Sequence, residues 1–347
     1  MRRWFILIMT VFAMCIPVKA QKYEAPPAPK SVEHIVPEEA DSFAQGLWNV
    51  VRACIEEFHP ALAQGAGVSL KVLAAGLICG MITNFSGKET AGVIRLAGVA
   101  AVGTTLLRPS SALMDLGVET VRSLSSYGKL LIPVLTGALA AQGGGGTAAA
   151  LYAATAFFDS VLSSAVSSLM IPMLYLFLGL SIGYSAVQEP VLGKIKDLIK
   201  WLIQWILKIS LYLFTGFLTV TGVVSGNADA AALKAAKIAI SGAVPVVGGI
   251  LSDASEAVLV GAGVMRSAIG VYGLITIVAL FLSPFVKMGT QYLLMKITGG
   301  ICASFLKGGA SILVQDFCTA MGLILALTAT QTVLLLISTV CMMKGVS

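Results

Sequence analysis

The chain has 347 residues, of which 57% are hydrophobic and only 12% are charged, about half the charged share of a typical soluble domain. No globular core could bury this excess, so the composition excludes an ordinary soluble protein and indicates a protein that crosses a bilayer several times. The net charge of +6 comes from 23 Lys and Arg against 17 acids, without a long basic run with interleaved aromatics. We therefore expect contacts with anionic lipid and no nucleic-acid binding.

The N-terminus has the pattern of an export signal. Arg2 and Arg3 precede an apolar stretch from Trp4 to Val18, and Ala20 ends a motif of spaced small residues that a signal peptidase accepts. This pattern predicts a signal peptide over residues 1–20, cleaved after Ala20. The alternative is a short uncleaved anchor.

Residues 21–64 differ in character from the leader and from all that follows. They contain five prolines and more acids than bases, which favours the exported side of the membrane. Within this segment, apolar residues recur at helical spacing over residues 41–58, which predicts an amphipathic helix that docks on the bundle or on a partner. We therefore treat residues 21–64 as an extracytoplasmic segment and residues 65–347 as a polytopic transmembrane domain.

The remainder is a series of apolar runs separated by short polar breaks. Their lengths predict about six to eight crossings in an all-α, polytopic transmembrane helix bundle. A run of about forty residues must bend, and Pro172 is the expected place. The run over 130–141 is too short to span and predicts a half-helix or re-entrant element, so we expect broken or re-entrant helices. The runs are 67–85, 91–107, 130–141, 148–187, 201–224, 235–251, 257–283, 285–305 and 320–343.

A basic segment over residues 190–208 marks the cytoplasmic side. A polar stripe of Lys196, Lys200, Gln204 and Lys208 recurs every fourth residue and two tryptophans flank it, with isoleucine and leucine expected on the opposite side of the helix. This pattern predicts a helix at the cytoplasmic headgroups, where lysine meets anionic lipid and tryptophan favours the interface. Alternatively, the lysines only occupy the start of the next span, and both interpretations place residues 190–200 inside. The candidate surface residues are Lys194, Lys196, Lys200, Trp201, Trp205 and Lys208.

The sequence lacks the residues that catalysis or ATP hydrolysis would need. No glycine-rich phosphate loop with its lysine and Ser or Thr is present, and the only two histidines are His34 and His59 in the outward segment. The six cysteines have no metal-ligand spacing. We expect no enzyme activity, no cofactor and no metal.

A proline and paired glycines interrupt the apolar run before residue 251. Pro245, Gly248 and Gly249 break a helix there, either to line or gate a conduit or to form a tight re-entrant hairpin for packing. Ionisable groups in a bilayer cost several kcal/mol and usually face a pore or a partner. Asp253, Glu256 and Arg266 are such candidates on one helix face, although Asp253 and Glu256 also suit a helix cap at the water interface.

Three strings in the C-terminal half carry a family resemblance. They are TVTGVVSGN from Thr219 to Asn227, LKAAKIAISGAVPVVGGILSDASEAVLVGAG from Leu233 to Gly263, and KMGTQYLLMKITGG from Lys287 to Gly300. The chain resembles the stage III sporulation protein AE family from its signal peptide to its final span, most specifically between about residues 215 and 300.

The resemblance implies a setting that composition does not show. It implies an endospore-forming bacterium, with the protein in the mother-cell membrane that surrounds the forespore. By this resemblance, the protein looks like one subunit of a complex with other membrane proteins of the stage III sporulation A operon. That complex meets a forespore protein and is thought to form a secretion-like channel needed for forespore development. A separate cytoplasmic ATPase would supply energy.

Two functional hypotheses follow. The first is a channel or permease-like subunit that forms a homo-oligomer and whose broken helices line or gate a conduit. The second is a non-conducting membrane scaffold that recruits and positions the ring-forming and ATPase partners. The resemblance offers no catalytic residues and does not decide between the two.

Overall fold

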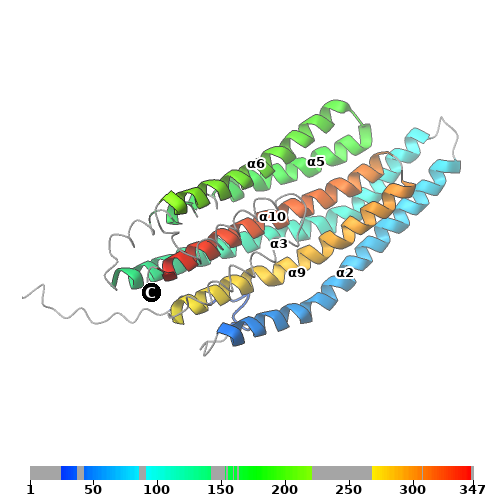
Figure 1. Ribbon diagram of the computed structural model, residues 1–347. Coiled ribbons are helices and arrows are strands. Elements are labelled where there is room, and N and C mark those ends of the chain that lie inside the picture. The colour runs from blue at the N-terminus through cyan, green and yellow to red at the C-terminus, as the bar shows by residue number, and fades with distance from the viewer. Residues whose placement is uncertain are drawn as a thin grey trace, which may run out of the picture.

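In the computed structural model, every regular element of the described residues is a helix (Figure 1). The structure describes residues 25–36, 43–85, 91–141, 153–220 except 154, 159, 162 and 163, 268–306 and 308–344. The helices are α2 (Phe43–Phe85), α3 (Ala91–Ala141), α5 (Ile171–Val187), α6 (Pro190–Val220), α9 (Ala268–Phe305) and α10 (Gly309–Lys344), with a π-helical turn, η1, over Val166–Met170 directly before α5.

These six helices form three hairpins, α2/α3, α5/α6 and α9/α10. Their connections lie at one end of the bundle, which we call the turn end (Figure 1). Two of the turns contain a residue in the left-handed backbone region, Gln188 with φ 59° and Gly308 with φ +87°. Glycine adopts this conformation without strain, and such a residue commonly ends a helix. The start of α2 and the end of α10 lie at the opposite end, which we call the open end.

The first and third hairpins pack side by side in the same direction. Glycines on α2 lie against successively later residues of α9, and glycines on α3 lie against successively later residues of α10, so each of these pairs is parallel. α5 covers α10 and part of α3, and α6 packs on α5 (Figure 1). The contacts that set the register are Gly46–Ile275, Gly65–Gln291, Gly76–Leu306, Gly103–Leu313, Gly117–Ile324 and Gly128–Leu335.

Five of the described helices are long and apolar enough to cross a membrane, by length and composition. They are α2, α5, α6, α9 and α10, and α3 is not among them. α10 is the most enclosed, because 89% of its apolar window is buried inside the bundle. The expected membrane-helical class is therefore confirmed, whereas the number of six to eight crossings stays a prediction because residues 221–267 lie outside the described part.

Several expected runs merge into longer helices. The amphipathic segment 41–58 and the run 67–85 form one helix, α2, which passes through residue 64 without a break. The short run 130–141 is the end of the 51-residue α3, which continues through Pro109 and Pro133. Proline removes only one backbone hydrogen bond, so packing against α10 along its length can hold such a helix together.

The break expected near Pro172 coincides with an irregular stretch. The π-helical turn Val166–Met170 ends where α5 begins, and Pro172 occupies the first turn of α5. Proline has no N–H to donate to the preceding turn, so a wider turn is accommodated there at little cost.

Candidate functional site

The residues predicted to line or gate a conduit are not among those that the structure describes. Pro245, Gly248, Gly249, Asp253, Glu256 and Arg266 all fall within residues 221–267. Their roles stay predictions. The signal peptide, residues 1–20, also lies outside the described residues.

The basic segment 190–208 is the first part of one continuous helix, α6, which extends to Val220 without a break. Lys194, Trp201 and Trp205 are exposed, and the two indole rings stack with centroids 5.9 Å apart. Lys200 and Lys208 are partly buried. A place for these five residues at the cytoplasmic headgroups stays a prediction.

Lys196 differs from its neighbours because its side chain is buried in the bundle. It shares the inner face of α6 with Ile199, Ile203 and Leu207, all of them buried, whereas Ile195 is exposed. The face that packs is thus rotated from the apolar face expected from the sequence, because α5 and α10 contact the side of the helix that carries Lys196.

A buried ion pair joins Lys196 to Asp316 of α10. The lysine Nζ donates to both carboxylate oxygens, at 2.7 Å to Oδ2 and 3.0 Å to Oδ1. The two side chains are only 8% and 12% exposed. Contact with both oxygens at these distances is the geometry of a strong charge-assisted hydrogen bond.

α5 completes the surroundings of the pair. The Tyr184 ring lies with its centroid 4.8 Å from Lys196 Nζ, within the range of a cation–π contact. The Ser181 hydroxyl, which donates to the Phe177 carbonyl oxygen at 2.8 Å, is fully buried. The pair is therefore enclosed where the second and third hairpins meet.

Glycine permits this close approach at the turn end. A Cβ on Gly309 would collide with the backbone carbonyl oxygen of Ser185 on α5. A Cβ on Gly193 would lie 3.0 Å from the Tyr184 ring. Small residues let membrane helices pack backbone to backbone, which brings α10 and α6 close enough for the ion pair.

The pair joins two helices that are long and apolar enough to cross a membrane, near their turn end. Lys196 is six residues into α6 and Asp316 seven into α10, or about 10 Å from the turn end at 1.5 Å per residue. Both fall within segments apolar enough to span. Charges in such a setting usually pair with one another and mark a pathway or a functional contact between helices.

Two further polar contacts link the helices nearer the middle of the bundle. The Tyr175 hydroxyl of α5 donates to Asp115 Oδ1 of α3 at 3.2 Å. Glu57 of α2 accepts hydrogen bonds from Ser283 and Lys287 of α9, the latter at 3.3 Å. Each of the three hairpins is thus connected to another by an ionisable side chain.

Asp316 was not among the residues singled out from the sequence. It is the only acid between Gly309 and Lys344, which is a signal that a search for isolated charges in apolar runs would find. Among the described residues, no group of three or more His, Cys, Asp or Glu side chains could hold a metal ion.

The fold and this site define an all-helical membrane protein that holds ionisable groups between its helices. A comparison of the sequence with protein families identifies its family. The chain belongs to the family described as Stage III sporulation protein AE, whose sequence model matches residues 30–345, and the resemblance expected from the three strings is confirmed.

A relative from Bacillus subtilis (strain 168), called Stage III sporulation protein AE, is 22% identical over 262 residues. The match covers 75% of this chain and 65% of the relative, just under two thirds of the relative's length. No solved structure matches the chain.

Proposed function

We propose that this chain is a channel or permease-like subunit of a secretion-type sporulation complex that links mother cell and forespore and supports forespore development. The observation that carries the proposal is the buried Lys196–Asp316 pair inside helices apolar enough to span a membrane. A passive anchor has no need of a buried ion pair between such helices, whereas transport proteins commonly use charges inside their helix bundles. Family membership supplies the sporulation setting.

The proposal assigns the chain a place and partners. It lies in the mother-cell membrane around the forespore, with its turn end in the cytoplasm. Basic residues near that end, such as Arg95 and Lys194, favour this orientation. Its partners are the other membrane proteins of the stage III sporulation A operon and their cytoplasmic ATPase, and it acts as a homo-oligomer. It carries out no catalytic step, and the ATPase provides the energy.

A specific observation also favours the scaffold as a second candidate. At 1.5 Å per residue, the 51-residue α3 is about 75 Å long, whereas the hydrocarbon core of a bilayer is about 30 Å thick. Part of the bundle must therefore project from the membrane, where its helices offer a surface to partner proteins.

Reconstitution separates the two candidates. The full chain is placed in liposomes, and release of trapped small ions and fluorescent solutes is measured with and without the ATPase partner. A conducting subunit raises release above that of protein-free liposomes. Liposomes that stay sealed under both conditions, together with mislocalised partner proteins in sporulating cells that lack the chain, would establish the scaffold instead.

A charge swap tests whether the ion pair matters to the conducting role. Lys196→Asp combined with Asp316→Lys keeps a pair but reverses it, and Lys194→Met on the exposed side of α6 is the matched control. We expect the swap to change release or spore formation while the control leaves both unchanged. If the swapped and unaltered chains behaved equally, the orientation of the pair would have no part in conduction.

A further inference from the structure

The exposed side of α3 is polar over a length comparable to the thickness of a bilayer. Between residues 104 and 129 the only exposed apolar residues are Leu107 and Ala112. The distance along the helix is about 37 Å at 1.5 Å per residue. The exposed polar residues, three or four apart, are Thr104, Arg108, Ser111, Asp115, Glu119, Arg122, Ser126 and Lys129, which we call the α3 polar face.

The opposite side of α3 is an ordinary packing surface. Leu106, Leu124 and Leu131 are fully buried, and α3 packs along α10 throughout its length. The helix is therefore held by one side, and its charges are displayed on the other. Five charged residues, Arg108, Asp115, Glu119, Arg122 and Lys129, lie in this middle part of α3.

α5 shows at what depth the α3 polar face lies. Its candidate span, Ser168–Val187, contains no charged residue and has 20 residues, about the 30 Å of a hydrocarbon core. Tyr175, in the interior of that span, donates its hydrogen bond to Asp115. If α5 crosses the bilayer, Asp115 and the residues one or two turns on either side lie at bilayer depth.

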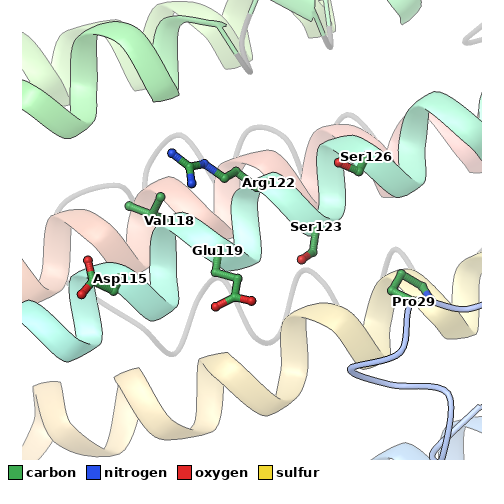
Figure 2. Close-up of a pocket in the computed structure, with 7 residues that line it drawn as sticks. All are labelled: Pro29, Asp115, Val118, Glu119, Arg122, Ser123 and Ser126. Carbon is green, nitrogen blue, oxygen red and sulfur yellow. The ribbon is translucent and has the colours of Figure 1, made fainter.

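The surface beside the α3 polar face is hollowed. A pocket of about 550 Å³ is lined by Asp115, Glu119, Arg122 and other residues of α3, with Pro29 of the N-terminal segment (Figure 2). In Figure 2 the Glu119 side chain points to the α9 side and the Arg122 side chain to the side of α5 and α6. The hollow is open to its surroundings and large enough to hold several water molecules.

We infer that the α3 polar face forms one wall of an aqueous path through the bilayer. This inference rests on the proposed conducting role and places the conduit along α3. Exposed charges at this depth cannot face lipid without a large cost, so they must face water or polar protein. Along the face from the turn end the charges run Arg108, Asp115, Glu119, Arg122 and Lys129. Both signs are present, so the path accepts polar solutes and ions in general.

Cysteine accessibility in liposomes tests this inference on the full chain. Ser111→Cys and Ser126→Cys place thiols on the α3 polar face, and Leu176→Cys, exposed on α5 beside Tyr175, is the control at the same depth. The described cysteines, 54, 79, 302, 318 and 341, are all buried, so the unaltered chain supplies the background. A membrane-impermeant methanethiosulfonate reagent reports water access, because it reacts with the thiolate form.

We expect Ser111→Cys to react at least ten times faster than Leu176→Cys. Three results would overturn the inference. Equally slow reaction means that lipid or protein covers the face, equally fast reaction means that this depth lies outside the bilayer, and faster reaction at Leu176→Cys means that α5 faces the water. Serine and cysteine are similar in size, and Ser126→Cys repeats the test should Ser111→Cys fail to fold.

This outcome is separable from that of the proposed function. Liposomes that stay sealed while Ser111→Cys reacts quickly would refute the conducting role and leave the water-exposed face standing. Liposomes that release solutes while Ser111→Cys stays protected would keep the conducting role and move the path elsewhere. In conducting liposomes, Asp115→Asn with Glu119→Gln should shift the preference between cations and anions toward anions.

Discussion

Removal of one partner from the Lys196–Asp316 pair should destabilise the protein more than removal of both. Lys196→Met leaves a buried carboxylate without its cation, and Asp316→Leu leaves a buried ammonium without its anion. The double variant replaces the pair with two apolar side chains. Lys194→Met, exposed on the same helix, is the control for loss of a lysine as such.

The structure sets the size of the effect. With charge centres about 4 Å apart and an effective dielectric constant of about 20, the attraction is about 4 kcal/mol. The side chains are 8% and 12% exposed, so an unpaired charge would stay largely desolvated. Each single variant should therefore lose about 3–5 kcal/mol, and the double variant should lie within about 1 kcal/mol of the unaltered chain or be more stable.

The assay is reversible unfolding in mixed micelles, with helix content followed by circular dichroism as the denaturing detergent fraction rises. The four proteins of the double-mutant cycle give the coupling energy between the two side chains. A coupling below about 1 kcal/mol, or a double variant less stable than both single variants, would refute the reasoning and show that the pair is loosely held or hydrated.

Three other predictions concern packing, a second polar contact and orientation. Gly309→Ala should cost at least about 3 kcal/mol in the same unfolding assay because its Cβ meets a backbone carbonyl of α5, whereas Gly300→Ala, which faces open space, should cost little. Glu57→Gln should cost up to about 1 kcal/mol because its contacts with α9 are partly exposed. Glu56→Gln, in a largely exposed pair with Arg52, should be neutral within error. A reporter fused after Lys344 should be exported, since the end of α10 lies opposite the turn end, and a cytoplasmic signal there would reverse the orientation.

The internal arrangement of the bundle also bears on topology. The first arms of all three hairpins run toward the turn end and the second arms return (Figure 1). Residue 43 and residue 190 consequently lie at opposite ends, which is compatible with an outward N-terminal segment and an inward basic segment. Parallel packing of the first and third hairpins is a tertiary feature that no local pattern indicates.

The amino-acid sequence by itself determined the membrane environment, the helical class and the family of this protein. Long apolar runs with few charges permit only helices in a bilayer, because every backbone polar group must be satisfied within its own segment. The irregular turn beside Pro172 was likewise predictable, since proline cannot donate the missing hydrogen bond.

Only the tertiary structure decided which helix faces meet. Helical periodicity placed Lys196 on one side of its helix with Lys200 and Lys208. Lipid and protein interior are equally apolar, so periodicity could not distinguish the lipid-facing side from the packed side. The partner of Lys196 lies 120 positions away, in a helix whose register depends on Gly309 and the turn before it. For the same reason, the charges of α3 became a continuous exposed face only once its other side was seen to pack on α10.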